Sequence, residues 1–347
     1  MAALWSLRAD SAGKHARESV YGQGRASRPL SLIGATHPTD CAEASGPLWV
    51  RSRRSRPCDR LPESGRSAHH LRLCAAGDTS VKFGRSRLTG TAICLLLTAT
   101  AQAAVIEREV DYKSGDTVLK GSLQYDDSRA GKRPAVLVVH EWSGLNEHAR
   151  HQAHRLAEAG YVALALDMYG DAKQAHRPHE AAVLSTEIRT NLPLMEARFD
   201  AARDLLRSQP NVDPTRIAAI GYCFGGAVVL QMARAGEDLR GVVSVHGVFD
   251  ADPVAKPGAV KAEVLMLQGD ADPYTQKEQL DALDRELKAA GARYKIVTYA
   301  GAKHSFTNPA PNEYGGQQFD MPENEYNADA DQQSWKEIVT FLKRVMR

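Results

Sequence analysis

Short apolar segments alternate with amphipathic helical segments along residues 104–347, and this alternation constrains the fold more than any other feature of the sequence. Each apolar segment is almost continuously hydrophobic, which is typical of a strand buried on both faces of a sheet. The segments read PAVLVVH, YVALALD, RIAAIG, GVVSVHG, EVLMLQG and YKIVTY. They predict an α/β fold, in which a mostly parallel central sheet carries helices on both faces.

A different pattern precedes these segments. The stretch VIEREVDYKSGDTVLKGSLQYDD alternates polar and apolar residues on both sides of Ser114, Gly115 and Asp116. A period of two around a turn is typical of an antiparallel hairpin, which we expect at the edge of the sheet. Neither an internal repeat nor a second domain boundary follows, so residues 104–347 are predicted to form one domain.

The first 80 residues differ in composition from the rest. They are rich in Arg, Ser, Gly and Pro, as in RSRRSRPCDRLPESGRS, and they have no hydrophobic periodicity. Such a segment cannot bury enough apolar surface to offset its chain entropy, so residues 1–80 are predicted to be disordered.

Residues 81–103 have the layout of a secretory signal peptide. Three basic residues precede a short apolar run, and Ala101-Gln102-Ala103 supplies an A-x-A cleavage pattern. The run is too short to span a bilayer permanently, so no stable membrane insertion is expected after cleavage. Because a signal peptide belongs at the N-terminus, we expect translation to start near Val81 and residues 1–80 to be an untranslated upstream extension. The mature domain is then predicted to be periplasmic or secreted.

Two other interpretations of the N-terminal residues fit less well. An Arg- and Ser-rich organelle transit peptide is acidic-poor, whereas seven acidic residues interrupt residues 1–80. A lipid anchor at Cys94 lacks the small residue expected just before it, because Ile93 occupies that place.

Charge and cysteine content both change at residue 104. Residues 104–347 carry 29 basic and 35 acidic side chains, so the domain is acidic and a nucleic-acid or anionic-membrane partner is not indicated. Four of the five cysteines, namely Cys41, Cys58, Cys74 and Cys94, precede this point. Only Cys223 remains in the domain, which therefore has no internal disulfide and carries one thiol that requires an explanation.

The segment RIAAIGYCFGGAVVLQMA places that thiol between a strand and a helix. The spacing G-x-C-x-G-G allows the strand and the helix to approach closely while the Cys223 side chain stands at the strand end. Asp272 and His304 follow two later strands, and the carboxyl ends of parallel strands meet at one edge of a sheet. The chain order nucleophile, acid, base is that of the α/β-hydrolase fold. We therefore predict a Cys223-His304-Asp272 triad, in which Asp270 is the competing acid.

Five motifs together resemble the dienelactone hydrolase family over essentially all of residues 105–347. They are HEWSG, DMYG, GYCFGG, GDADPY and AKHSFTNP. The resemblance implies an α/β-hydrolase that cleaves a small ester or lactone, with a cysteine nucleophile and without a metal or other cofactor. It also assigns Glu141 a role: a carboxylate near the thiol keeps the resting cysteine neutral, and the family's glutamate is thought to move on substrate binding and accept the thiol proton.

Further site residues follow from the fold and the resemblance. The backbone N–H groups of Phe224 and Trp142 are expected to bind the developing oxyanion. Trp142, Tyr222 and Phe306 are expected to wall an apolar substrate pocket, and Arg189 could supply an anion contact. Enzymes of the family that act on dienelactone have an arginine four residues after the catalytic histidine, where this chain has Asn308. The natural substrate therefore stays open, as does the oligomeric state.

Alternatives remain at both the residue and the function level. His148, His151 and His154 are three apart on a helix, a spacing that drifts around the cylinder, so we expect surface residues and no metal site. His246 and Asp167 are expected to be structural. A thiol amidase or amidotransferase-like enzyme would share the elbow, but such enzymes usually carry His-x-Glu, whereas Ser305 and Phe306 follow His304. A non-catalytic binding protein with a hydrolase-like fold is the third possibility.

Overall fold

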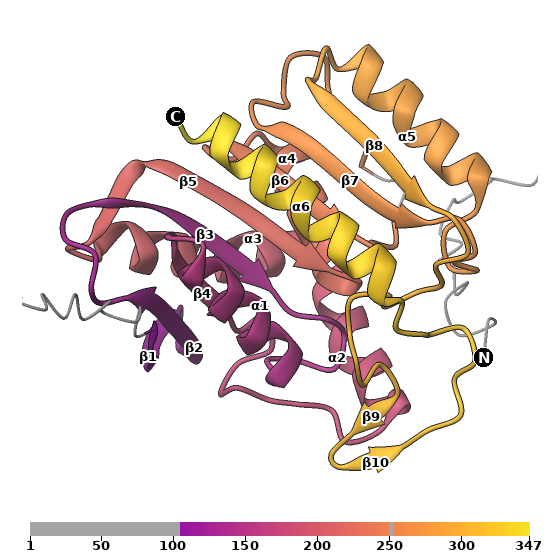
Figure 1. The fold of residues 1–347 in the computed structure, drawn as a ribbon, viewed down its shortest axis with the longest axis horizontal. Coiled ribbons are helices and arrows are strands. Elements are labelled where there is room, and N and C mark those ends of the chain that lie inside the picture. The colour runs from indigo at the N-terminus through magenta and orange to yellow at the C-terminus, as the bar shows by residue number, and fades with distance from the viewer. Residues whose placement is uncertain (1–104, 250–252) are drawn as a thin grey trace, which may run out of the picture. The chain divides into compact units, whose positions relative to one another are not determined.

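The computed structural model describes residues 105–249 and 253–347, and its centre is an eight-stranded sheet (Figure 1). The strand order is β1-β2-β4-β3-β5-β6-β7-β8, and every pair from β4 to β8 is parallel. The strands are β1 (Val105–Ser114), β2 (Thr117–Asp126), β3 (Arg133–Val139), β4 (Val162–Leu166), β5 (Val212–Tyr222), β6 (Gly241–Val245), β7 (Glu263–Gly269) and β8 (Tyr294–Tyr299). The prediction of a mostly parallel α/β sheet is confirmed.

The hairpin predicted at the sheet edge is also confirmed. Strands β1 and β2 pair antiparallel from Val105↔Asp126 to Ser114↔Thr117, with the turn at Gly115, whose φ is +57°. A positive φ suits glycine, which has no Cβ to clash with the backbone. Strand β2 also pairs antiparallel with β4, so the hairpin extends the parallel sheet on one side.

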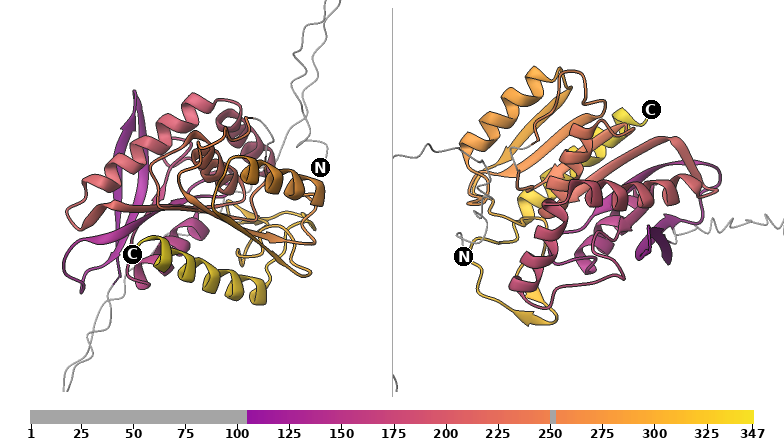
Figure 2. Two further views of the ribbon diagram at one scale, coloured as in Figure 1. Left: turned by 90° about the horizontal axis from the view of Figure 1, so that it is seen from above. Right: turned by 180° about the vertical axis from the view of Figure 1, so that it is seen from behind.

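Helices cover both faces of this sheet, as the edge-on view in Figure 2 shows. Alternate residues of each buried strand point to opposite faces, so Leu137 joins one hydrophobic cluster and Val138 the other. The helices are α1 (Glu147–Glu158), α2 (Pro178–Arg189), α3 (Leu192–Ser208), α4 (Phe224–Ala235), α5 (Lys277–Ala289) and α6 (Ala328–Val345). Helices α1 and α6 pack on one face, and α2 to α5 pack on the other.

A small hairpin lies between β8 and α6, where the sequence patterns predicted no element. Its strands are β9 (Glu313–Tyr314) and β10 (Gln317–Gln318), which pair antiparallel. Tyr314 and Met321 pack there against Ala181 of α2 in a third hydrophobic cluster. The chain that follows the last sheet strand is thereby packed against α2, from the middle of the sequence.

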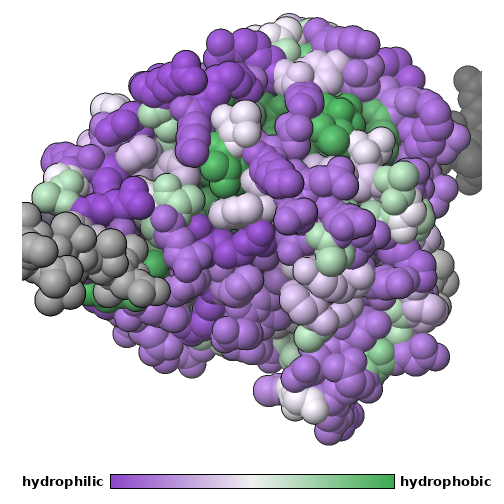
Figure 3. Space-filling view, viewed as in Figure 1, coloured by the Kyte–Doolittle hydropathy of each residue, from purple (hydrophilic) through white to green (hydrophobic). Residues whose placement is uncertain are grey.

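The face seen in Figure 3 is covered mainly by hydrophilic side chains, between which smaller hydrophobic areas are visible. Among the described helices, none is both long and apolar enough to cross a bilayer. The predicted extension (1–80) and signal peptide (81–103) lie outside the described residues, and the predicted domain (104–347) is described from Val105 onward.

Candidate active site

Cys223 lies at the end of β5 and is the N-cap residue of α4. Its φ is +53°, a left-handed value that is strained for a residue with a side chain and is found at functional turns. The glycines around it are required by space. A Cβ at Gly221 would lie 1.9 Å from the Gly225 carbonyl oxygen, and a Cβ at Gly225 would lie 2.4 Å from the Val139 oxygen. The sequence G-x-C-x-G-G therefore forms a tight strand-to-helix turn.

His304 connects Cys223 to Asp272. The Nδ1 atom of His304 is 2.8 Å from Asp272 Oδ2, and the imidazole also makes a side-chain hydrogen bond with Cys223. Burial alone would lower the pKa of His304, but the Cys223 and Asp272 charges and hydrogen bonds outweigh it and hold the pKa well above its usual range. The Cys223 and Asp272 contacts therefore favour the protonated form of the His304 imidazole.

The two candidate acids are separated by their contacts. The Asp272 carboxylate is buried and accepts hydrogen bonds from Gln268 Nε2 at 2.7 Å and from the Tyr274 N–H at 2.9 Å, in addition to its contact with His304. Asp270 is exposed and accepts from the Gly301 N–H at 2.6 Å. The residue in contact with His304 is therefore Asp272, and Asp270 closes a turn.

Glu141 lies in the loop after β3, and both of its carboxylate oxygens are occupied. Oε1 accepts from Ser305 Oγ at 2.9 Å, and Oε2 accepts from Asn308 Nδ2 at 2.6 Å. His148 Nδ1 is 3.5 Å from Oε2. The side chain is 4 % exposed, so these neutral donors replace water around a buried charge. In this arrangement the carboxylate is bound to the segment that follows His304.

A second histidine contacts the nucleophile from behind. The backbone N–H of Cys223 donates to His246 Nδ1 at 3.1 Å, so that nitrogen carries no proton, and Nε2 donates to Thr307 Oγ1 at 2.9 Å. Burial lowers the pKa of His246 well below its usual value. His246 is therefore neutral, and it joins the nucleophile turn to the loop after the base.

The prediction that His148 is a surface residue is wrong. His148 is 6 % exposed, and its Nε2 is 3.2 Å from Gln152 Nε2 and 3.4 Å from Thr307 Oγ1. Its face of α1 turns inward toward Glu141, and burial lowers its pKa. His151 is exposed, and the side chain of His154 is 44 % exposed, as expected for surface positions.

Trp142 is held at two points by tyrosines. The Tyr169 hydroxyl donates to the Trp142 carbonyl oxygen at 2.9 Å, and the indole Nε1 donates to the Tyr314 hydroxyl oxygen at 2.7 Å. Phe224 is the first residue of α4, so its N–H has no acceptor within the helix and lies at the positive end of the helix dipole. The two predicted oxyanion donors thus come from a doubly anchored residue and from a helix N-terminus.

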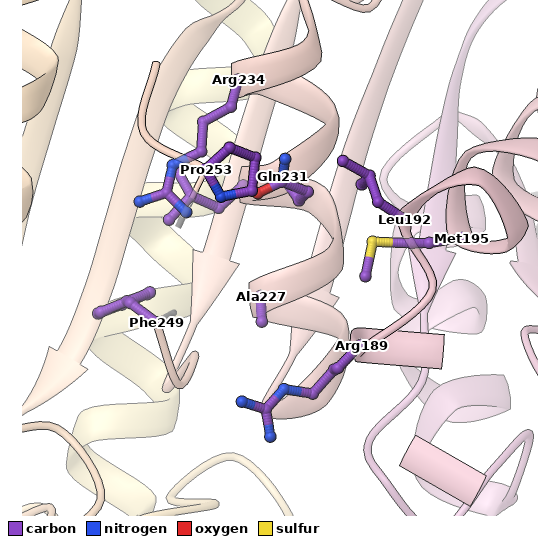
Figure 4. Close-up of a pocket in the computed structure, with 9 residues that line it drawn as sticks. Arg189, Leu192, Met195, Ala227, Gln231, Arg234, Phe249 and Pro253 are labelled. Carbon is purple, nitrogen blue, oxygen red and sulfur yellow. The ribbon is translucent and has the colours of Figure 1, made fainter. Parts of the chain in front are cut away.

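A pocket opens alongside α4, from Ala227 to Arg234, as Figure 4 shows. Ala227, one helical turn after Cys223, lies on its wall, whereas the residues that line the pocket do not include Cys223, His304 or Trp142. Arg189, at the end of α2, also lines it, and its charge acts on Tyr169. The remaining lining residues are Leu192, Met195, Leu230, Gln231, Arg234, Phe249 and Pro253.

Tyr222 and Phe306 are placed differently from the prediction that they wall the pocket. Both are at most 1 % exposed and belong to the hydrophobic cluster on the α1 and α6 face. Their rings pack against His246, with centroids 5.9 Å and 5.2 Å away. Tyr222 faces the opposite side of the sheet from Cys223 because successive residues at a strand end alternate in direction, whereas Phe306 lies in the loop after β8.

The structure adds residues to this site that sequence reasoning did not select. Ser305 follows the predicted base directly and Thr307 is three residues after it, so proximity in sequence was an available signal for them. Tyr314 had none, because it reaches the site through the hairpin after β8. Within residues 105–249 and 253–347, no group of three or more His, Cys, Asp or Glu side chains is arranged to hold a metal ion.

Comparison with known proteins gives the context for this geometry. The model of the family described as "Dienelactone hydrolase family" matches residues 120–346. Among solved structures, a dienelactone hydrolase-like promiscuous phosphotriesterase from metagenomic libraries is 34 % identical, with a TM-score of 0.66, and the match covers 70 % of this chain and 100 % of that one. A dienelactone hydrolase from Anabaena variabilis shares the fold with a TM-score of 0.52 and 22 % identity, over 70 % of this chain and 99 % of the other.

Curated proteins give a consistent result. A Methylorubrum extorquens protein provisionally named a carboxymethylenebutenolidase is 25 % identical over 257 residues, which is 71 % of this chain and 84 % of the relative. An uncharacterised Caenorhabditis elegans protein is 32 % identical over 43 % of this chain and 92 % of its own length.

Proposed function

The chain belongs to the dienelactone hydrolase family and is a hydrolase, and from that premise we propose that it cleaves a small carboxylic ester or lactone with Cys223 as the nucleophile. The observation that carries the proposal is His304, whose ring bridges the Cys223 thiol and the Asp272 carboxylate at the ends of separate strands. A thiolate at neutral pH needs a stabilising partner within hydrogen-bond reach, and the His304 imidazole supplies one.

In the proposed first half-reaction, Glu141 accepts the proton of the Cys223 thiol, and the resulting thiolate sulfur forms a bond to the carbonyl carbon of the substrate. The electron pair of the carbonyl moves to oxygen, where the Phe224 and Trp142 N–H groups are proposed to bind it; one such donor contributes roughly 3 kcal/mol. When the carbonyl re-forms, the bond to the alkoxy oxygen breaks. The proton on His304 goes to that oxygen, and a thioester remains on the enzyme.

In the second half-reaction, His304 removes a proton from water, and the resulting hydroxide attacks the thioester carbonyl. The acid product leaves, and the sulfur is released as thiolate beside the protonated imidazole. Glu141 then returns its proton to the sulfur, which restores the resting thiol. Asp272 is proposed to keep the Nδ1–H of His304 directed away from the sulfur and to stabilise the imidazolium. For Glu141 we propose the family's role of accepting the thiol proton when substrate binds, which would require it to leave Ser305 and Asn308.

The substrate side of the proposal rests on the pocket beside α4. Its aliphatic and aromatic lining suits a small apolar acyl or alkoxy group. Arg189, the predicted anion contact, also lines it and already takes part in another interaction. Small esters or lactones, with and without a free carboxylate, are therefore the compounds to assay.

The test compares p-nitrophenyl acetate hydrolysis by residues 104–347 with the same chain carrying Cys223→Ala or His304→Ala. We expect turnover by the wild type and a loss of at least about a thousandfold in each variant. Equal rates in all three proteins would reject the triad. Absence of turnover with esters and lactones but cleavage of amides would favour the thiol amidase alternative, and no turnover of any kind would favour a binding protein.

A second candidate activity, phosphotriester hydrolysis, is favoured by the relative that is 34 % identical over its whole length and is described as a promiscuous phosphotriesterase. The same thiolate would attack phosphorus and displace an aryloxide, and the resulting phosphoryl-cysteine would be hydrolysed by water. Measuring p-nitrophenol release from paraoxon by wild type and Cys223→Ala tests this activity; a rate that does not depend on Cys223 would reject it.

We also propose that the protein is exported, on the signal-peptide layout of residues 81–103. Mass spectrometry of the mature protein from its host is expected to give Ala104 as the first residue. A chain that retains residues upstream of Ala101 in the cytoplasm would reject export.

A further inference from the structure

Tyr314 brings a phenol to the candidate active site from outside the sheet. It belongs to β9, it is 3 % exposed, and its ring packs edge-on against Trp142 with centroids 6.2 Å apart. Burial raises the pKa of its hydroxyl, and the nearby Glu141 and Cys223 charges act in the same direction. Tyr314 therefore stays a neutral phenol, with a proton to donate, near the nucleophile.

The hydrogen bond to Trp142 uses only part of the capacity of this hydroxyl. A phenol oxygen accepts hydrogen bonds and also donates one. The indole Nε1–H of Trp142 can only donate a hydrogen bond, so the Tyr314 oxygen is the acceptor in this 2.7 Å contact. The hydroxyl proton is left over, and within residues 105–249 and 253–347 the structure gives it no acceptor.

The other tyrosine that contacts Trp142 differs in this respect. Tyr169 donates its proton to the Trp142 carbonyl oxygen at 2.9 Å, and burial beside the Cys223 charge raises its pKa well above the usual range. Its proton is therefore already used within the protein. The indole of Trp142 orients the Tyr314 hydroxyl, whose proton remains available for a hydrogen bond. The Tyr169 hydroxyl serves a structural role.

The segment that carries Tyr314 is fixed to the base. The His304 N–H donates to the Glu323 carbonyl oxygen at 3.2 Å, and the Glu325 N–H donates to the His304 oxygen at 3.0 Å. Within the same segment, Asn312 Nδ2 donates to the Met321 oxygen at 3.0 Å. The phenol is thereby held at a set position relative to the triad, as a group that recognises substrate must be.

Resting on the ester or lactone hydrolase proposed above, we propose that the Tyr314 hydroxyl donates a hydrogen bond to a second acceptor on the substrate, separate from the carbonyl under attack. Tyr314 is then a specificity-determining residue. It selects acyl or alkoxy groups that carry an ether, keto, hydroxyl or carboxylate oxygen over hydrocarbon groups of the same shape. A buried donor left unpaired by a hydrocarbon group disfavours that substrate.

The test uses two matched pairs of esters that differ by one oxygen in place of one methylene. The acyl pair is p-nitrophenyl methoxyacetate and p-nitrophenyl butyrate, and the alkoxy pair is 2-methoxyethyl acetate and n-butyl acetate. For each pair, the ratio of kcat/KM for the ether ester to that for the hydrocarbon ester is measured in wild type and in Tyr314→Phe. Intrinsic differences in reactivity cancel when the two proteins are compared.

We expect Tyr314→Phe to lower this ratio about five- to tenfold in at least one pair. Loss of the Trp142 anchor affects both members of a pair, so it cancels in the ratio. The control is Tyr326→Phe, because the Tyr326 hydroxyl donates to Asp331 at 3.3 Å and its residue is 38 % exposed. The control should leave both ratios unchanged.

An equal loss for both members of each pair, or no loss in either, would overturn the proposal and leave Tyr314 as a packing partner of Trp142. If wild type cleaves none of the four esters, the hydrolase proposal itself fails, which is a distinct result. If Tyr314→Phe does not fold, as judged by thermal melting, Trp142→Phe replaces it. Removing the indole donor frees the phenol to rotate, so the ratio should fall there too, and an unchanged ratio would count against the role.

Discussion

Three buried histidines surround the candidate active site and differ in charge: His304 is favoured as the protonated form, whereas His246 and His148 are neutral. His304 lies between the Cys223 thiol and the Asp272 carboxylate, and its pKa is held well above the usual range. His246 and His148 are just as buried, but their ring nitrogens contact a backbone N–H, a threonine hydroxyl and an amide, and their pKa values are lowered. Burial is common to all three, so the bonded partner decides the charge.

Glu141 refines this comparison. It lies 3.5 Å from His148 Nδ1, and its charge raises the pKa of that histidine, yet burial has the larger effect and His148 is neutral. The carboxylate is already shared between Ser305 and Asn308. In this site a carboxylate therefore favours the protonated form of a buried histidine only when the carboxylate is hydrogen-bonded to the imidazole ring, as Asp272 is to His304.

The largest expected effect comes from removing the negative charge of Asp272, which distinguishes His304 from the two neutral histidines. Asp272→Asn should lower kcat for p-nitrophenyl acetate by about a thousandfold to ten-thousandfold, because the amide no longer stabilises the imidazolium or fixes its tautomer. The matched control is Asp270→Asn, two residues away, where the carboxylate bonds only the Gly301 N–H in the described chain. A loss of similar size in the control, or a loss under tenfold in Asp272→Asn, would contradict the distinction between the two aspartates.

A smaller effect, on stability, is expected when a hydrogen bond of the neutral His246 is removed. Thr307→Val leaves His246 Nε2–H without its acceptor in a fully buried position, which should lower the free energy of unfolding by about 1–3 kcal/mol. Urea denaturation measures it. Thr190→Val is the control, since the Thr190 hydroxyl bonds the Thr186 oxygen on an exposed helix end and should change stability by less than about 0.5 kcal/mol. Equal stability of wild type and Thr307→Val would mean that His246 does not depend on this bond.

The smallest effect concerns the pH dependence of stability. The folded pKa of His148 lies below the unfolded value of about 6.5, so the unfolded chain binds the extra proton as the solution is acidified. Its contribution to stability is complete above pH 6.5 and is lost as the pH falls from there through the folded pKa. Each such histidine adds up to about 1.4 kcal/mol per pH unit to this loss.

His148→Gln should therefore flatten the fall in the free energy of unfolding between pH 7 and pH 5, measured by denaturant titration. His154→Gln, on the same helix with its side chain 44 % exposed, should keep the wild-type slope. If both variants keep it, the neutral state of folded His148 is refuted. His304 acts in the opposite sense, because its raised folded pKa stabilises the protein below pH 6.5, and that stabilisation is lost as the pH rises through the folded value.

Residues that continue a strand were the ones that the sequence could place. Cys223, Asp272 and His304 each follow an apolar segment, and parallel strands bring such positions to one edge whatever the details of packing. His148 was misplaced because the spacing of histidines along a helix does not say which face turns toward a buried carboxylate. Tyr222 was assigned to the wrong layer, since successive residues at a strand end point to opposite faces. Phe306 lies in the loop after β8, where no strand period indicates the direction of a side chain.

Tyr314 and its hairpin were beyond the reach of such patterns. Two-residue strands in a stretch rich in Pro, Asn and Gly carry no hydrophobic period, and their position is set by tertiary contacts with α2 and Trp142. Local sequence rules describe the sheet, whereas this covering segment depends on contacts between residues far apart in the chain.

The backbone of His304 is hydrogen-bonded to Glu323 and Glu325, whereas Tyr314 lies earlier in the same segment. One part of this segment therefore positions the base, and another part carries the proposed specificity residue. A single proteolytic cut between residues 312 and 321 would leave the His304 backbone hydrogen bonds intact and would free the hairpin that carries Tyr314. Such a cut would leave the triad in place and loosen both the Tyr314 hydroxyl and Trp142, so substrate selectivity and oxyanion binding depend on a hairpin that the triad does not need.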